Sequence, residues 1–437
     1  MTLPTSPFEG VHLRWPIERD ALPFAVRVVE PRRLDPSGHA DLFNAIVQEL
    51  VSPSTVPRDR FDEATSRPAS RRYDLVTFPE AFAPAACVVA LAEALRGVGP
   101  TGCLHIGLRA DDDPASHLFT VPALLSLVAD LGASVDAALG DLDGFTAWLG
   151  RQSPDHMFNV GCVLAVDARS HLRVCLHPKL VRSKFEVDRL PERHMREANL
   201  LTLVTLVPTQ PRFGTVTLQP IICSDALKLE TDRRTPPPIP AVTLHAECLV
   251  DPPNHVDVVS VATCTPQPAG RHAGGARYRV WHSQFLETFR AAAEDPDCAR
   301  HHFATIVLAN YMEISDRLAG GLSGAFLPVP PGAAAGDPAV SVSCWGRPKS
   351  GSPPNNRWSD PDVEPLKNWD SRGYVVGLDP FSSDAASSAR VLSFDVHRLP
   401  RETSRWRPGE SLVALDVSVW EEQDGGGYIS RRGASNG

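Results

Sequence analysis

The chain has 437 residues, of which 43% are hydrophobic and 22% are charged, and these proportions are typical of a globular protein with a sizeable apolar core. Its formal net charge of −9, with no long run of lysine and arginine, argues against a general nucleic-acid-binding surface. Its sequence contains no stretch of the roughly 18 apolar residues that a membrane-spanning helix needs.

The N-terminus and the cysteines both indicate a cytoplasmic protein. The first nine residues lack the basic start and the apolar stretch of a signal peptide. The nine cysteines are odd in number and widely spread, and they include no Cys-x-x-Cys pair. This usage favours reduced thiols over a disulfide framework. The 15 histidines show no metal-binding spacing either, so we expect no metal site.

Short apolar runs alternate with helical patterns along the chain. Strands are expected at 22–29, 75–78, 103–108, 159–166, 172–176, 215–222, 256–262, 305–309, 324–327, 391–396 and 412–419. Helices are expected at 40–50, 83–95, 118–131 and 283–293, and a short helix begins at residue 224. The turn-forming segment 167–170 predicts a hairpin from the two strands that flank it. This alternation predicts an α/β domain whose strands are buried on both faces.

Proline-rich and glycine-rich segments interrupt these elements and mark loops. The expected organisation is an N-terminal extension at 1–21, one domain at 22–400 with long insertions near 51–70, 226–250 and 330–375, and a C-terminal tail at 401–437. The insertion at 330–375 carries Trp345, Trp358 and Trp369 among polar residues. It is either a surface excursion or a lid or protein-binding surface, since exposed aromatic residues often mark contacts.

Cys223 stands at a position where a thiol could be reactive. It ends the apolar run Thr215–Ile222, and the polar pair Ser224-Asp225, which favours a helix start, follows it. A thiol at such a strand-to-helix turn lies over a helix N-terminus, whose partial positive charge favours the nucleophilic thiolate. The alternative is a buried and inert core cysteine.

Glu80 and Lys179 also follow strand-like runs. Glu80 ends the segment Asp74–Glu80, and Lys179 comes directly after His177-Pro178. Taken alone, Glu80 is more typical of a solvated residue at the end of a strand, and Lys179 of an exposed loop. Together with Cys223 they provide a carboxylate, an amine and a thiol, a set that suits acyl transfer at an amide or nitrile carbon. They can converge only in a fold where the ends of their strands meet.

Five segments in the same order resemble the nitrilase, or carbon–nitrogen hydrolase, superfamily. They are the apolar-Pro-Glu segment Leu75–Glu80, the Asn-led hairpin Phe158–Lys179, the Gly-to-Cys segment Phe213–Asp225, Ala309-Asn310, and Gly320–Pro328. The resemblance covers residues 22–400 and implies an α-β-β-α sandwich of four layers.

The resemblance also implies a mechanism and a set of site residues. Cys223 is expected to form a thioester, Glu80 to act as general base, and Lys179 to stabilise the oxyanion, with no cofactor. Lys184 is an alternative to Lys179. Asn159 and Asn310 are expected to support the site. Many members of this family have a second glutamate after the lysine, which positions the substrate or the lysine itself. Glu186 is favoured over Glu192 for this role. Asp225 is expected to cap the helix after Cys223.

The chain departs from the family pattern at several positions. Pro178 precedes the lysine, Ser224 follows the cysteine where an aromatic residue is common, and Pro220 falls inside a predicted strand, which an interior strand rarely tolerates. The sequence therefore predicts a divergent member of this superfamily, and the known substrates of its other branches do not identify the substrate of this chain.

Three functions remain open from the sequence. The first is a cysteine-dependent hydrolase of a non-peptide carbon–nitrogen bond, most simply a small-molecule amide. The second is an interaction or regulatory module that has a repurposed pocket and binds a protein partner through the insertion at 330–375. The third is an acyltransferase that uses the same thioester. Family resemblance also implies a homodimer that exchanges its C-terminal segments, and neither nucleic acid nor membrane is an expected partner.

Overall fold

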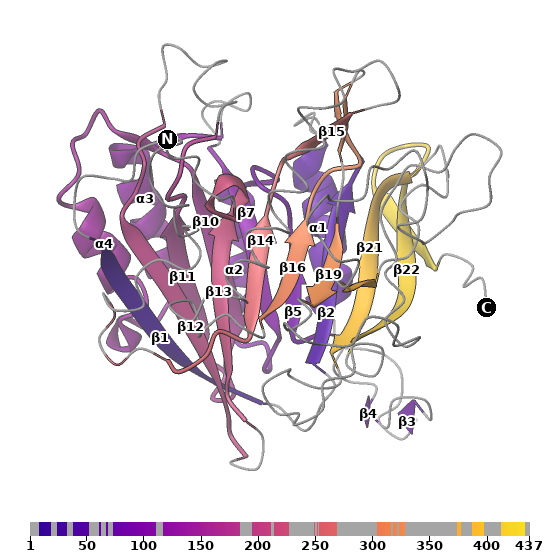
Figure 1. Cartoon of the computed structure of the whole chain (residues 1–437), viewed down its shortest axis with the longest axis horizontal. Coiled ribbons are helices and arrows are strands. Elements are labelled where there is room, and N and C mark those ends of the chain that lie inside the picture. The colour runs from indigo at the N-terminus through magenta and orange to yellow at the C-terminus, as the bar shows by residue number, and fades with distance from the viewer. Residues whose placement is uncertain are drawn as a thin grey trace, which may run out of the picture.

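The computed structural model describes residues 8–18, 24–32, 38–51, 61–62, 67–68, 73–110, 117–183, 195–210, 214–226, 249, 251, 253–268, 304–315, 318–320, 323–327, 374–376, 387–396 and 412–432. These residues form a mixed α/β fold with two large sheets and several small ones (Figure 1).

The first large sheet has seven strands in the described chain. Their order is β1 (Glu9–Ile17), β12 (Leu200–Pro208), β13 (Val216–Ile222), β14 (Val258–Ala262), β16 (Thr305–Ala309), β19 (Gly324–Leu327) and β20 (Tyr374–Val376). Strands β13, β14 and β16 run parallel, so their carboxyl ends meet at the same edge of the sheet.

The second large sheet has nine strands in the described chain. Its order is β11 (Leu172–Pro178), β10 (Val160–Val166), β7 (Cys103–Arg109), β5 (Leu75–Thr77), β2 (Phe24–Pro31), β21 (Ser387–Val396), β22 (Leu412–Glu422) and β23 (Tyr428–Arg432), with β6 (Ala83–Pro84) pairing with β7. Strands β2, β5 and β7 are parallel to one another. Since β10 is antiparallel to both β7 and β11, β11 runs in the same direction as β5 and β7.

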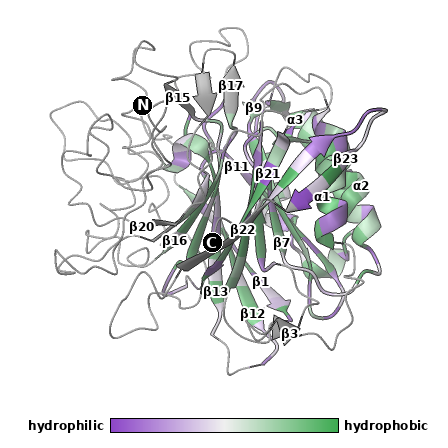
Figure 2. Ribbon diagram, turned by 90° about the vertical axis from the view of Figure 1, so that its right-hand side faces the viewer, coloured by the Kyte–Doolittle hydropathy of each residue, from purple (hydrophilic) through white to green (hydrophobic). Residues whose placement is uncertain are grey.

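Helices cover one face of the nine-stranded sheet (Figures 1 and 2). They are α1 (His39–Val51), α2 (Ala85–Leu95), α3 (Val121–Gly132) and α4 (Asp143–Leu149). The start of α3 follows from its sequence, because Thr120 Oγ1 accepts the Ala123 amide at 3.3 Å and a proline stands in the first turn. Its buried residues recur at three- and four-residue spacing and are Val121, Leu124, Leu127 and Leu131.

The two large sheets pack against each other on their other faces. One apolar cluster contains residues of both sheets, including Val28 of β2, Val163 of β10 and Val261 of β14, and it forms the core between them. A second cluster lies between the helices and the nine-stranded sheet. Because they lie between these clusters, strands β7 and β10 are buried along their whole length, which confirms the expectation of strands buried on both faces.

Polar side chains also cross the interface between the sheets. The Ser260 hydroxyl of β14 lies 2.7 Å from Thr77 Oγ1 of β5 and 2.7 Å from His105 Nδ1 of β7. The His105 Nε2 atom lies 3.1 Å from Nε2 of His177 in β11. Buried polar atoms need partners, and this chain of contacts supplies them.

Most predicted elements are present close to their expected bounds, and the hairpin of β10 and β11 is confirmed. Strands β1 and β12 and helix α4 were not predicted. Residues 9–17, expected in an N-terminal extension, instead pair with β12 as an edge strand. In the expected tail, β22 and β23 pair with β21 of the same chain. The helix expected at 283–293 and the insertion at 330–373 lie outside the described residues.

Pro220 lies inside β13, where the sequence predicted an interruption. The strand continues because its pairing with β12 extends only from Val216 to Leu218. Beyond that point only β14 pairs with β13, and Pro220 is aligned with Ser260 there. The lack of a backbone N–H donor at Pro220 therefore costs little stability at this position.

None of the described helices is both long enough and apolar enough to cross a membrane.

Candidate active site

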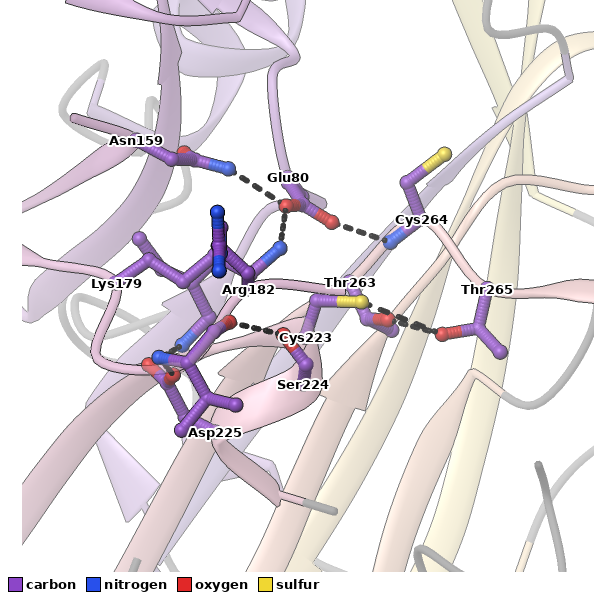
Figure 3. A network of polar contacts seen from close by, with 12 residues as sticks. Glu80, Asn159, Lys179, Arg182, Cys223, Ser224, Asp225, Thr263, Cys264 and Thr265 are labelled. Atoms are coloured by element: carbon purple, nitrogen blue, oxygen red, sulfur yellow. Dashed lines mark hydrogen bonds and ion pairs between the residues drawn. The ribbon is translucent and has the colours of Figure 1, made fainter. Parts of the chain in front are cut away.

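The sheet topology brings Glu80, Lys179 and Cys223 into one site. Lys179 and Cys223 directly follow the carboxyl ends of β11 and β13, and Glu80 lies three residues after β5. These strands point the same way within their sheets, and the two sheets face each other. Figure 3 shows the three side chains grouped where these strand ends meet.

Three donors hold the Glu80 carboxylate. Lys179 Nζ and Asn159 Nδ2 both donate to Oε1, at 2.8 and 2.7 Å, and the backbone amide of Cys264 donates to Oε2 at 3.1 Å. The carboxylate is therefore fixed in orientation before any substrate arrives. The Asn-led hairpin start and the lysine after it, which the sequence singled out, both contact the same oxygen.

The backbone around Glu80 is constrained as well. Ala81 has a φ of 56°, which a residue with a side chain rarely adopts. The Tyr311 hydroxyl donates to the Glu80 carbonyl at 2.7 Å, and Tyr311 is fully buried. A Cβ on Gly107 of β7 would lie 2.3 Å from the Pro79 carbonyl oxygen, so only glycine permits this close approach.

Lys179 is buried, with only 1% of its surface exposed. Its backbone amide donates to the Asn159 carbonyl at 2.8 Å, which ties the end of β11 to the start of β10. A buried ammonium group needs a counter-charge, and the Glu80 carboxylate supplies it. The pair places a cation and a base next to each other in a site shielded from water.

Cys223 occupies a sharp turn at the end of β13. Its φ is 44°, and it is 3% exposed. Strain of this kind in a residue other than glycine is often found at functional sites. Its Sγ atom lies 3.7 Å from Thr265 Oγ1. The element that follows is a 3₁₀ helix of four residues, Cys223–Ala226, so the expected support from a helix dipole is smaller than a full helix would give.

Asp225 has different contacts from the helix cap that the sequence predicted. Its Oδ1 atom accepts the amides of Leu180 and Val181 at 2.9 Å each, and Oδ2 accepts the Ile222 amide at 3.2 Å. The carboxylate thus ties the segment after Lys179 to the turn that carries Cys223. Burial raises the pKa of Asp225 from 3.8 to about 7, although Lys179 and these amides act in the opposite direction.

The segment Thr263–Thr265, after β14, forms another wall of the site. The hydroxyls of Thr263 and Thr265 lie 2.6 Å apart. Asn310, after β16, accepts the Thr265 amide at 3.1 Å and donates to the Thr265 carbonyl at 2.9 Å. Asn310 therefore holds the segment that carries Thr265, whose hydroxyl lies next to Cys223.

Some expected residues cannot be placed, and others were missed. Glu186, Glu192 and the alternative lysine Lys184 lie outside the described residues. Thr265 and Tyr311 were not predicted as site residues. Both follow apolar strands at the same edge as Cys223, and this position is the sequence signal that could have found them.

The described residues contain no cluster of three or more histidine, cysteine, aspartate or glutamate side chains that could hold a metal ion. What the site does offer is a thiol on a strained turn and a buried carboxylate–ammonium pair. This combination can carry out nucleophilic chemistry with proton transfer.

No protein-family model and no curated protein sequence matches the chain. Among solved structures, the chain matches a crystal structure of an N-terminal amidase with an Asn-Glu-Ala peptide, over 70% of this chain and 90% of that chain. The sequence identity is 9% and the TM-score is 0.34. A similarity of this size does not establish a family or an activity for this chain.

Proposed function

We propose that the protein is a cysteine-dependent hydrolase of a non-peptide carbon–nitrogen bond, most simply an amide, of the nitrilase type. The observation that carries the proposal is the buried Glu80–Lys179 pair, 2.8 Å apart, next to a cysteine on a positive-φ turn. A structural role alone gives no reason to bury a lysine and a glutamate beside a strained thiol.

In the proposed reaction, Cys223 attacks the amide carbon and forms a new carbon–sulfur bond, while Glu80 takes the thiol proton. Lys179 and the backbone amide that follows Cys223 stabilise the negative charge on the carbonyl oxygen. The carbon–nitrogen bond then breaks, and the proton from Glu80 goes to the leaving amine. A thioester remains on Cys223.

Water completes the cycle. Glu80, now ionised again, removes a proton from a water molecule, which attacks the thioester carbon. The carbon–sulfur bond breaks, the acid product leaves, and Cys223 recovers a proton. The fixed orientation of the Glu80 carboxylate suits a group that must serve twice in one cycle.

The proposal includes the four-layer α-β-β-α architecture of the nitrilase type. The helices and the two facing sheets of the described chain supply three such layers. The helix that the sequence predicts at 283–293 lies outside the described residues. We place the catalytic domain within residues 22–400, extended by β1, and we expect a homo-oligomer.

The test is a screen of primary amides, nitriles, N-carbamoyl compounds and secondary amides, with ammonia or amine release as the readout. Cys223→Ala and Glu80→Gln are expected to lower kcat/KM at least about a thousandfold, with an unchanged circular dichroism spectrum. Cys87→Ala, on helix α2, is the matched control. A folded and fully active Cys223→Ala protein would refute the proposal.

The same experiment separates the other two functions. An acyltransferase gives an acylated acceptor in place of the free acid when amines are added. An interaction module gives no turnover of any substrate, and its binding to a protein partner survives Cys223→Ala.

A further inference from the structure

Two threonine hydroxyls form a short chain of contacts that ends at the sulfur atom of Cys223. Thr265 Oγ1 lies 3.7 Å from Cys223 Sγ, and Thr263 Oγ1 lies 2.6 Å from Thr265 Oγ1. All three residues are buried, with at most 3% of their surface exposed. Figure 3 shows both threonine side chains on the side of the sulfur atom that faces away from Lys179. The nucleophile of the proposed reaction therefore has a buried hydroxyl beside it that the mechanism above does not use.

The direction of these contacts depends on the charge of Cys223, because each hydroxyl has one proton to donate. A neutral thiol can donate to Thr265, which then donates to Thr263, and the Thr263 proton has no acceptor within the described chain. A thiolate can only accept, so Thr265 donates to the sulfur atom and Thr263 donates to Thr265. In this arrangement both protons have an acceptor. Since a buried donor without an acceptor is costly, the two hydroxyls favour the ionised form of Cys223.

The backbone of this segment is held by contacts that do not involve the hydroxyls. Asn310 accepts the Thr265 amide and donates to the Thr265 carbonyl, and the Thr263 amide donates to the Ala309 carbonyl at 2.9 Å. The Cys264 amide, between the two threonines, donates to Glu80 Oε2. One segment of three residues thus contacts both the proposed general base and the proposed nucleophile, and its fixed backbone holds the Thr265 hydroxyl in place.

We propose that Thr265 is a further residue of the catalytic machinery, whose hydroxyl donates to the Cys223 thiolate and stabilises its negative charge, with Thr263 donating to Thr265 from behind. This inference rests on the proposed hydrolase function. Hydrogen bonds to an ionised group are stronger than those between neutral groups, and a donor to the charged form favours ionisation. The hydroxyl keeps its own proton throughout, and the thiol proton still goes to Glu80.

Negative charge appears on the sulfur atom twice in the proposed reaction. It appears first when Glu80 takes the thiol proton. It appears again when the carbon–sulfur bond of the thioester breaks and the bonding electrons return to sulfur. A donor that is fixed beside Sγ stabilises the charge on both occasions. Thr265 therefore complements Lys179, which acts on the charge of the carbonyl oxygen.

The test is the pH dependence of the alkylation of Cys223 by iodoacetamide, read by peptide mass spectrometry in the wild type, Thr265→Val and Thr265→Ser. Valine has the shape of threonine without the hydroxyl, and serine keeps the hydroxyl. The midpoint of the rate against pH reports the ionisation of the thiol, and the plateau at high pH reports access to it. We expect Thr265→Val to raise the midpoint by at least about one pH unit, and Thr265→Ser to keep it near the wild-type value.

Thr217→Val is the matched control. Thr217 is a buried threonine near the start of β13, at the opposite end of the strand from Cys223, and its hydroxyl lies 3.1 Å from that of Thr205. This variant is expected to leave the midpoint unchanged. Thr265→Ala also lacks the hydroxyl and replaces Thr265→Val if valine disrupts folding. An unchanged midpoint in the variants without the hydroxyl overturns the inference. So does a change in the plateau alone, which a purely structural role would give.

The same curves separate this inference from the hydrolase proposal. A low wild-type midpoint that Thr265→Val does not change means that other groups activate the thiol, so the inference is wrong while the hydrolase function stands. A wild-type midpoint near about 8.5, the value of an ordinary free thiol, contradicts an activated nucleophile. A further rise in Thr265→Val would then still support the contact with the thiolate, and no rise would contradict it.

Discussion

The carboxylate of Asp225 shows how one buried side chain can organise this site. It accepts two amides from the segment after Lys179 and one from the turn of Cys223, so it fixes the distance between the ammonium and the thiol. Its burial carries a cost, because a desolvated carboxylate is hard to ionise, and its pKa rises to about 7.

This raised pKa makes a prediction about stability. Between pH 3.8 and about 7 the folded protein keeps a proton that the unfolded chain releases, so the contribution of Asp225 falls as the pH rises through this window. Asp225→Asn cannot ionise. We predict that the difference in unfolding free energy, wild type minus variant, shrinks by about 1.4 kcal/mol per pH unit across the window.

Urea denaturation of both proteins at several pH values measures this difference. The variant keeps an oxygen for the Leu180 and Val181 amides but loses the acceptor for Ile222. A constant offset between the proteins is therefore expected at all pH values. A difference that grows as the pH rises would mean that the carboxylate is stabilised in its ionised form, contrary to the burial seen here.

At the scale of elements, strand β7 limits the position of Glu80. A Cβ on Gly107 would lie 2.3 Å from the Pro79 carbonyl oxygen and 2.5 Å from the Glu80 Cα atom. These are backbone atoms, which cannot rotate away as the end of a side chain can.

We predict that Gly107→Ala shifts the Glu80 turn, lowers the unfolding free energy by about 1–3 kcal/mol, and lowers kcat/KM on any amide substrate at least about tenfold. Gly132→Ala is the matched control, because nothing lies within 4 Å of a Cβ there, at the end of α3. Full activity in Gly107→Ala would mean that the position of Glu80 is not critical.

The same elements show what the sequence could and could not predict. Strands such as β16 and β19 were predicted with the bounds that they have, because short apolar runs between turn residues are a strong signal. Strands β1 and β12 carry signals that were missed: β1 alternates apolar residues at Val11, Leu13, Trp15 and Ile17, and β12 is a long apolar, β-branched run.

The contacts across the site could not be predicted in the same way. The sequence identified Glu80, Lys179, Cys223 and Asn159 as residues of one site, and the strand order brings them together. The role of Asp225 was wrong, because its amide partners come from a distant segment and depend on how the two sheets face each other. Local sequence contains no information on that contact.

At the scale of the whole molecule, the two large sheets are joined by a buried histidine network. His105 contacts both Ser260 of the facing sheet and His177 of its own sheet. One nitrogen of the histidine pair must donate and the other accept, so the accepting ring must be neutral and the two rings cannot both be protonated. Burial lowers the pKa of His177 from 6.5 to about 3, and burial followed by the charge of His177 lowers the pKa of His105 well below 6.5.

Acid is therefore expected to weaken the packing of the sheets. Below pH 6.5 the unfolded chain takes up protons that the folded protein refuses, so this stability is complete above pH 6.5 and is lost as the pH falls toward about 3. As the pH falls through this window, we predict that His177→Gln loses about 1.4 kcal/mol less unfolding free energy per pH unit than the wild type does. The glutamine amide can lie near the position of the ring Nε2. Denaturation curves between about pH 5 and 7 provide the measurement, and an equal slope in the two proteins would contradict the account.

The central claim is that Cys223 is an activated nucleophile, and the rate of its alkylation by iodoacetamide, read by peptide mass spectrometry, tests it most directly. Cys162 and Cys175 serve as internal references, because they are as deeply buried as Cys223 and burial raises the pKa of both. We predict that near pH 7 Cys223 reacts at least about tenfold faster than either reference, and that Glu80→Gln removes this advantage. If Cys223 reacts no faster than Cys162 and Cys175, the thiol is not activated and the proposed catalysis is wrong.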